Sequence, residues 1–200
     1  MHEFLQTLEG LSAGSLYALI ALFAAVENFF PPVPADTVIA LGAFLAGRGK
    51  LDAWTVFGIG WAANVGGAAA LYGLARRYGR PLFRGRFGRR LLPEAVLEHL
   101  EREYHRHGAY GIFLSRLLPV WRGVVTPFAG IAGLSPGRAL PPVALASALW
   151  YGGLTVLIVR LAPSLDTVLR HLGRVNRVLG AVALLAIVVL VVVVLRRLKR

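Results

Sequence analysis

The stretch Glu27-Asn-Phe-Phe-Pro-Pro-Val-Pro-Ala-Asp36 decides the fold of this chain. It places two carboxylates and three prolines (Pro31, Pro32 and Pro34) between two uncharged apolar runs. A charged side chain inside a membrane is costly and usually faces a cavity or a charged partner. Prolines interrupt a helix, and the backbone groups that they free must be covered by protein or by water. The stretch therefore predicts a re-entrant hairpin over residues 12–47, which enters the bilayer, breaks at its tip and returns.

The composition of the whole chain indicates an integral membrane protein. Of its 200 residues, 56% are hydrophobic and 16% are charged, and the mean hydropathy is +0.64. A chain of this length forms one domain. Its net charge of +12 comes mostly from arginine, and at this hydropathy we attribute the charge to an anionic membrane surface and expect no nucleic acid as a partner. The absence of cysteine excludes disulfides and thiolate chemistry.

Two later segments are long enough to cross a bilayer, which takes roughly 20 apolar residues. Residues 53–75 carry no charge. Small residues recur in this segment at every fourth position, a spacing suited to close helix contact, at Ala62, Gly66 and Ala70. Residues 139–159 are also uncharged, and we expect Pro141 and Pro142 in the first turn of this helix, where a missing N–H costs least. Both segments are predicted transmembrane helices.

The remaining segments carry most of the basic residues. Residues 76–107 are rich in arginine, and the positive-inside rule places them in the cytoplasm. The same arginines are suited to anionic lipid headgroups, and both interpretations can hold. A helix that begins at Pro93 has one apolar stripe and is expected to lie on the inner membrane surface. A last transmembrane helix with a basic tail covers residues 178–200, outside a core of residues 1–177.

A second broken apolar segment covers residues 110–133, where Arg116, Pro119, Arg122 and Pro127 interrupt the run. The order of a hairpin followed by a transmembrane span thus occurs twice. The distribution of the basic loops predicts that the two hairpins enter the membrane from opposite faces. Transporters built from inverted repeats have their sites where broken helices meet at the midplane. We therefore predict an all-α integral membrane fold with two re-entrant helical hairpins plus transmembrane helices in an inverted repeat.

The two hairpins carry charges of opposite sign. Glu27 and Asp36 lie on the first, and Arg116 and Arg122 on the second. Opposed across one cavity, these charges would compensate one another. A guanidinium binds a phosphate through two oxygens, and a carboxylate near apolar walls can exchange protons. The arginines are thus candidate ligands of an anionic headgroup, and the acids serve proton coupling or hold the arginines. The alternative is a salt-bridge set that only pins the hairpins together.

Two further polar residues lie in the predicted spans. Asn64 is in the middle of residues 53–75, and Trp150 is in the middle of residues 139–159. Both could line the same cavity as the four charges. For both residues, a packing role is the preferred interpretation.

Three motifs resemble those of the DedA family, also called the SNARE-associated or VTT-domain family. They are Glu27-x-x-x-Pro31-Pro32-x-Pro34-x-Asp36, then Gly73-x-x-Arg76-x-Tyr78-Gly79, and finally Phe113-x-Ser115-Arg116-x-x-Pro119-x-x-Arg122 followed by Pro127, Ala129, Gly130 and Trp150. Leu117 departs from the family, which often has an aromatic residue there. The resemblance implies re-entrant hairpins and lipid translocation without ATP. Bacterial members resemble flippases for undecaprenyl phosphate or phosphatidylethanolamine, and eukaryotic relatives act as phospholipid scramblases. It also implies dependence on the proton-motive force through Glu27 and Asp36, and headgroup binding by Arg116 and Arg122.

We therefore expect a flippase in the inner (cytoplasmic) membrane that moves an anionic lipid, with undecaprenyl phosphate as the preferred cargo. A phospholipid scramblase or a phosphatidylethanolamine flippase is the alternative. An integral lipid-phosphate phosphatase is disfavoured because no histidine pair has the companions that nucleophilic catalysis needs. His105 and His107 lack carboxylate or thiol companions, so we expect no metal, and no nucleotide loop or other cofactor motif is present. A membrane assembly protein is the third class of function considered. Whether the chain forms a homo-oligomer through its last span is left open.

Overall fold

The computed structural model of the chain describes residues 10–30, 33–79 and 108–161, with four single residues beyond them. The described residues form helices and no strand, which confirms the all-α prediction. Several sequence predictions lie outside the described residues. These are the basic segment and surface helix over residues 80–107, the prolines Pro31 and Pro32, and the last span after residue 178.

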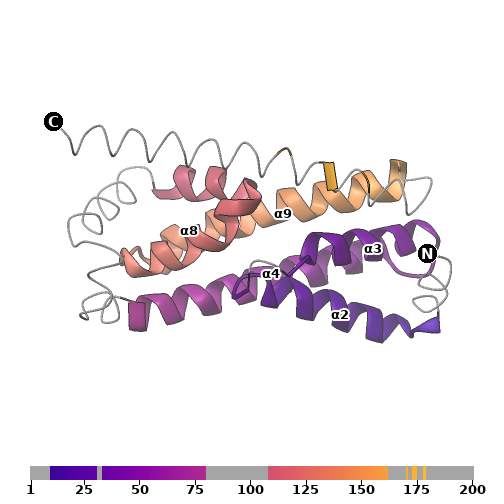
Figure 1. Cartoon of the computed structure of the whole chain (residues 1–200), viewed down its shortest axis with the longest axis horizontal. Helices are drawn as coiled ribbons and strands as arrows, with labels where there is room; N and C mark the ends of the chain where they lie inside the picture. Colours follow the sequence, from indigo (N-terminus) through magenta and orange to yellow (C-terminus); the bar gives the residue numbers. More distant parts are fainter. Residues whose placement is uncertain are drawn as a thin grey trace.

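The described helices follow one order twice: a short helix, a break, a second short helix and a long helix. The first set comprises α2 (Ala13–Val26), α3 (Ala35–Gly47) and α4 (Ala53–Leu74), which continues into a π-helical turn, Ala75–Gly79. The second set comprises a helical segment at 108–117, α8 (Pro119–Ile131) and α9 (Pro136–Leu161). In Figure 1, α2 and α3 lie toward one end of the molecule and α8 lies toward the other, while α4 and α9 run along its length.

The ends of the helices have local causes. Ser12 caps α2, because its hydroxyl oxygen accepts a hydrogen bond from the backbone N–H of Ser15 (3.1 Å). Asp52 caps α4 in the same way through Thr55. The hydrogen bonds from the side chain and the backbone of Thr55 lower the pKa of the exposed Asp52 carboxyl. In the second set, Leu118 is extended because Pro119 follows it, and the break lies there.

Three prolines lie elsewhere than the sequence suggested. Pro34 precedes α3 and Pro119 begins α8, as expected of residues at a break. Pro127, however, lies inside α8, which continues to Ile131. A proline removes one backbone hydrogen bond, and the helix tolerates that loss here. Pro141 and Pro142 are likewise not in a first turn, because α9 begins earlier, at Pro136.

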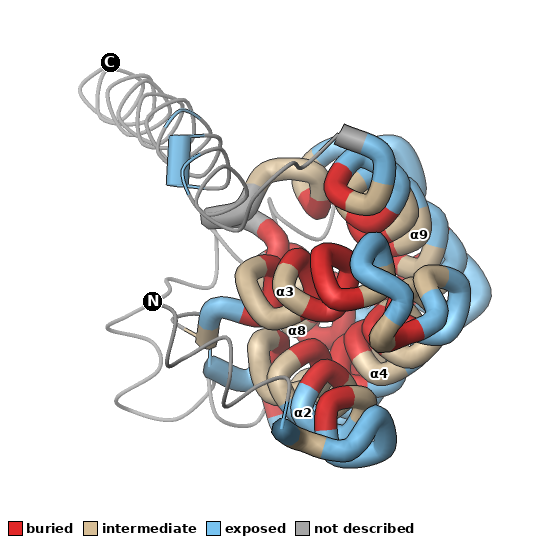
Figure 2. The backbone as a smooth tube through the Cα atoms, turned by 90° about the vertical axis from the view of Figure 1, so that its right-hand side faces the viewer, coloured by how far each residue is buried: buried red, intermediate tan, exposed pale blue. Residues whose placement is uncertain are grey.

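The central helix is α4, which contacts α2, α3, α8 and α9. Its buried face carries Val56, Gly60, Asn64 and Ala68. The face predicted for close helix contact (Ala62, Gly66 and Ala70) is exposed, and nothing lies within 4 Å of a Cβ built at Gly66. The prediction that this face of α4 makes close helix contacts was therefore wrong. Figure 2 shows the buried stretches of the helices facing one another in the middle of the bundle, with the exposed stretches outside.

Two glycines let backbones approach closely on either side of the bundle centre. A Cβ at Gly67 of α4 would lie 2.5 Å from the carbonyl oxygen of Ala25, so no larger residue fits beside the end of α2. A Cβ at Gly130 of α8 would lie 2.6 Å from the carbonyl oxygen of Tyr72. Nearby, Arg76 donates to the carbonyl oxygen of Leu134 (2.6 Å), which ties the π-helical turn after α4 to the turn before α9. These contacts set the distances across the site described below.

Membrane crossing can be judged by length and hydropathy. Among the described residues, one helix is both long and apolar enough to cross a membrane, Pro136–Arg160, with a mean hydropathy of 1.8. Helices α2 and α3 are apolar but have only 14 and 13 residues, short of the roughly 20 that a bilayer requires. Helix α4 has 22 residues, enough for a span by length, but it does not meet the hydropathy criterion that Pro136–Arg160 meets. That α4 crosses the membrane stays a prediction.

Candidate functional site

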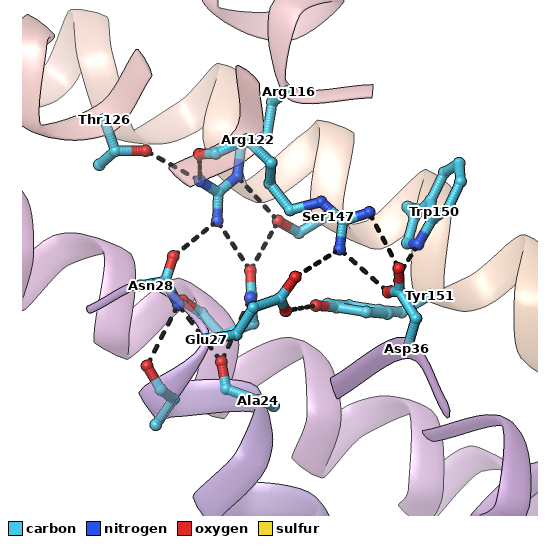
Figure 3. A network of polar contacts seen from close by, with 12 residues as sticks. Ala24, Glu27, Asn28, Asp36, Arg116, Arg122, Thr126, Ser147, Trp150 and Tyr151 are labelled. Atoms are coloured by element: carbon cyan, nitrogen blue, oxygen red, sulfur yellow. Dashed lines mark hydrogen bonds and ion pairs between the residues drawn. The ribbon is translucent and has the colours of Figure 1, made fainter. Parts of the chain in front are cut away.

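The four charged residues singled out in the sequence lie together in the middle of the bundle (Figure 3). Glu27 follows α2 directly, and Asp36 is in the first turn of α3. Arg116 is near the end of the helical segment 108–117, and Arg122 is in the first turn of α8. The arginines are almost fully buried, with exposed fractions of 2% and 5%. The charged residues near the two helix breaks therefore lie close together, as the sequence predicted.

Arg122 binds both carboxylates. Its Nη1 donates to Glu27 Oε1 (3.0 Å) and to Asp36 Oδ1 (2.9 Å), and its Nη2 donates to Asp36 Oδ2 (3.4 Å). The guanidinium carbon also lies 4.9 Å from the ring centre of Trp150 and 5.8 Å from that of Tyr151. Cations are attracted to aromatic faces at these distances. Arg122 is thus held by two negative groups and two rings.

Helix α9 supplies a further donor to each carboxylate. Trp150 Nε1 donates to Asp36 Oδ1 (2.9 Å), and the Tyr151 hydroxyl donates to Glu27 Oε2 (2.8 Å). The first assignment of Trp150 to packing alone was therefore incomplete, because its indole N–H binds the site. Each carboxylate is fixed from the second helical set by a guanidinium and by an aromatic donor.

Among the residues that the structure describes, Arg116 has no carboxylate partner. Its hydrogen bonds go to five neutral oxygens: Ser147 Oγ (3.2 Å) from Nε, the Arg122 carbonyl (3.1 Å) and Thr126 Oγ1 (2.8 Å) from Nη1, and Asn28 Oδ1 (3.1 Å) and Asn64 Oδ1 (2.8 Å) from Nη2. A guanidinium has five N–H donors. The number of bonds equals the number of donors, so neutral oxygens of the described part of the chain fill the hydrogen-bonding capacity of Arg116.

Two asparagines and a serine orient the acceptors of Arg116. Asn64 Nδ2 donates to the carbonyl oxygen of Ala24 (3.2 Å), and Asn28 Nδ2 donates to the carbonyl oxygen of Asn64 (3.1 Å). These bonds turn both side-chain carbonyl oxygens toward the guanidinium. The Ser147 hydroxyl donates to Asn64 Oδ1 (3.0 Å) and accepts from Arg116. Asn64 is therefore a ligand of the buried charge, and packing is not its main role.

The charges of the cluster balance as a set. With both carboxylates ionised, Arg122 leaves one negative charge uncompensated, and the positive charge of Arg116 balances it. Asn64 is the twelfth residue of α4, about 17 Å from the start of the helix at 1.5 Å per residue. That distance is about half the hydrocarbon thickness of a bilayer. With all four groups ionised the cluster thus has no net charge, and the span predicted for residues 53–75 would place it near the middle of the bilayer, where uncompensated charge costs most.

Sequence reasoning missed four members of this network: Asn28, Thr126, Ser147 and Tyr151. Part of the signal was available. Ser147 and Tyr151 are one turn apart on α9, and polar residues in an otherwise apolar span usually face the bundle interior. Thr126 is one turn beyond Arg122 on α8. Nothing local distinguished Asn28, which follows Glu27 at the break, from an ordinary turn residue.

Comparison with known proteins identifies the family. The VTT domain matches residues 33–168, more than half of the chain. This chain belongs to the VTT-domain (DedA) family. The match includes Asp36, both arginines and the aromatic pair of α9. The same three motifs that suggested the family in the sequence thus supply the charged network and the close contacts at Gly130.

The relatives are named mainly as membrane proteins. A membrane protein of Mycobacterium tuberculosis (strain ATCC 25618 / H37Rv) is 30% identical over 149 residues, which covers 72% of this chain and 67% of the relative. Undecaprenyl phosphate transporter A of Staphylococcus aureus is 24% identical over 176 residues, covering 86% and 87%. An alkaline phosphatase-like protein of Lactococcus lactis subsp. lactis is 28% identical over 188 residues, covering 88% and 86%. No solved structure matches this chain.

Proposed function

We propose that this protein is a lipid translocase of the inner membrane, which moves an anionic lipid, undecaprenyl phosphate, between the leaflets. The observation that carries the proposal is the buried cluster of two carboxylates and two guanidinium groups between the helix breaks. Intramembrane charges mark transport pathways by default. Membership of the family and the name of the Staphylococcus aureus relative support lipid transport.

The chemistry of the cluster suggests how a phosphate enters it. In the described state both carboxylates occupy Arg122, so no negative ligand is needed. A proton on Glu27 or Asp36 removes one negative charge, weakens one bond to Arg122 and leaves the cluster with a charge of +1. A lipid phosphate can then replace that carboxylate, because guanidinium groups bind phosphate as they bind carboxylate. Loss of the proton restores the carboxylate bond and expels the phosphate.

The two arginines have different tasks in this proposal. Arg122 is the first phosphate ligand, because its present partners are groups that protonation can release. Arg116 supplies a positive charge that titration of the cluster leaves in place, since its partners are neutral. It becomes a second ligand only when it gives up a neutral acceptor such as Thr126 Oγ1. Glu27 and Asp36 couple this exchange to the proton gradient.

The proposed architecture has two re-entrant hairpins, residues 12–47 and 110–133, in an inverted repeat with spans 53–75 and 139–159. The repeated order of helices and the position of α2–α3 and α8 toward opposite ends support it (Figure 1). In this arrangement each hairpin opens to a different side of the membrane, and the phosphate site lies between their tips. Residues 1–177 form the transporting core, and residues 178–200 add a last span and basic tail.

The test is transport in proteoliposomes that carry labelled undecaprenyl phosphate or labelled phosphatidylethanolamine, with and without a pH gradient. We expect undecaprenyl phosphate to cross faster than in empty vesicles, and the Arg122→Gln variant to lose at least 90% of this rate. Arg138→Gln is the matched control, because Arg138 is exposed near the start of α9. Equal rates for Arg122→Gln and the control would reject the site. Faster crossing of phosphatidylethanolamine would favour the alternative, a phospholipid scramblase or a phosphatidylethanolamine flippase. Release of inorganic phosphate would indicate a phosphatase.

A further inference from the structure

An apolar groove lies between α2 and α3. It has a volume of about 230 Å³, and the residues that line it are all apolar. Its walls include Leu16 and Phe23 of α2, and Val38 and Leu45 of α3, and Leu51 borders it as well. An apolar lining of this kind offers no hydrogen-bond partner to a polar group. The groove therefore offers no place for a headgroup and is suited to hydrocarbon.

The groove ends near Glu27. Phe23 lies one helical turn before Glu27 and on the same face, whereas Asp36 projects from the face of α3 opposite to Val38 and Leu41. From Leu16 to Phe23 the groove follows α2 for about 10 Å, at 1.5 Å per residue. Leu51, which borders the groove, lies in the connection between α3 and α4. The opposite end of the groove, at Phe23 and Val38, lies toward the break between α2 and α3, where Glu27 binds Arg122. A chain attached to a phosphate that replaces Glu27 at Arg122 would therefore start one helical turn from the inner end of the groove.

We propose that this groove holds the first part of the hydrocarbon tail of the lipid whose phosphate binds at Arg122. The inference rests on the proposed function and adds the tail site to it. A phosphate can reach the middle of the bundle only if its tail leaves the cluster sideways between helices. The α2–α3 groove is such an exit, since its inner end lies one helical turn from Glu27 and its lining has no polar side chain that the tail would leave unpaired.

The exposed fractions of two leucines on α2 give a matched pair for the test. Leu19 lines the groove and is 37% exposed, so a tryptophan there can fill the groove without entering the core. Leu22 is 57% exposed on the same helix and does not line the groove. Leu19→Trp therefore removes space for the tail, and Leu22→Trp adds the same bulk outside it.

The experiment uses an undecaprenyl phosphate analogue with a diazirine on the first isoprene units of its tail, in proteoliposomes. After illumination, we expect the label on residues 16–23 and 38–45 of the wild type and of Leu22→Trp. In Leu19→Trp the labelling of these segments should fall at least fivefold, and transport should fall with it. In Arg122→Gln the labelling should also fall, because the phosphate no longer anchors the lipid.

The possible outcomes separate this inference from the proposed function. Label on other segments of the wild type, while transport still depends on Arg122, would overturn the tail site and leave the translocase standing. Unchanged labelling and transport in Leu19→Trp would do the same, and would fit a groove covered by residues 1–9, residues 178–200 or a second copy. Unchanged labelling of the groove in Arg122→Gln would mean that the groove takes up lipid without help from the phosphate site. That result would overturn the proposed connection between the groove and Arg122. Absence of any transport by the wild type would instead refute the proposed function.

Discussion

Replacing each buried arginine by lysine tests the different environments of Arg116 and Arg122. Both substitutions keep the positive charge, so they change only geometry and the number of donors. Arg116 makes five hydrogen bonds to neutral oxygens, whereas lysine has three donors. Arg116→Lys must therefore lose at least two of them. Each hydrogen bond to a charged group contributes about 1.5–3 kcal/mol, so we expect a loss of about 3–6 kcal/mol in the free energy of unfolding.

Arg122→Lys is the matched control for this loss. Within the described residues, the Arg122 side chain makes three hydrogen bonds, all to Glu27 and Asp36, and a lysine has as many donors. The change weakens the contacts with the rings of Trp150 and Tyr151, each of which contributes about 0.5–2 kcal/mol. We therefore expect Arg122→Lys to cost clearly less than Arg116→Lys, about 2 kcal/mol or less.

The assay is thermal unfolding of the purified protein in one detergent, followed by tryptophan fluorescence. For a chain of this length, 1 kcal/mol shifts Tm by about 2–4 °C, so Arg116→Lys should lower Tm by roughly 6–24 °C. Arg122→Lys should lower it by less than about 8 °C on the same scale. A smaller shift for Arg116→Lys than for Arg122→Lys would refute the idea that the neutral oxygens are organised around Arg116. So would a shift for Arg116→Lys too small to measure.

Three further predictions follow from the same contacts. Asn64→Asp keeps an acceptor for Arg116 but gives the cluster a net charge of −1, so transport of a lipid phosphate should fall at least tenfold while the variant still folds. Gly67→Ala should lower stability by about 1–3 kcal/mol, because the new Cβ would overlap the backbone of α2, whereas Gly66→Ala at the neighbouring open position should be neutral or stabilising. Asp52→Ala should lower Tm at neutral pH, since it removes the cap of α4. Because the pKa of Asp52 is lowered, its stabilising effect is complete above the usual carboxyl range and is lost only as the pH falls through the lowered value, so wild type and variant should converge in strong acid.

Each of these predictions has a result that would contradict it. Normal transport by Asn64→Asp would mean that the net charge of the cluster does not control anion entry. Equal Tm values for the two glycine variants would contradict the close contact between α2 and α4. A constant difference between wild type and Asp52→Ala from neutral to strongly acidic pH would show that Asp52 acts by something other than its ionised side chain.

The amino-acid sequence was enough to predict that the chain is all-helical and that four charged residues meet. The reason is that charge inside an apolar run is so costly that it needs a partner, and the partners with opposite sign were at the other broken segment. The breaks at Pro34 and Pro119 were also predictable, because proline disturbs the residue before it. Pro127 was not, since a helix can lose one hydrogen bond and continue.

The contact face of α4 shows why packing was harder to predict. Small or polar residues recur at every fourth position on two faces of this helix, once as Ala62, Gly66 and Ala70 and once as Gly60, Asn64 and Ala68. Spacing alone favours neither face. Only the neighbouring helices decide between them, and they cover the second face, where Asn64 lies.

Partner choice within the cluster was decided by tertiary structure alone. Residue types allowed either arginine to take either carboxylate, and the folded chain gives both carboxylates to Arg122 and five neutral oxygens to Arg116. Hydrogen bonds depend on distances of a few tenths of an ångström between helices that are far apart in sequence. Those distances follow from backbone contacts such as the one at Gly67, which no local pattern of residues specifies.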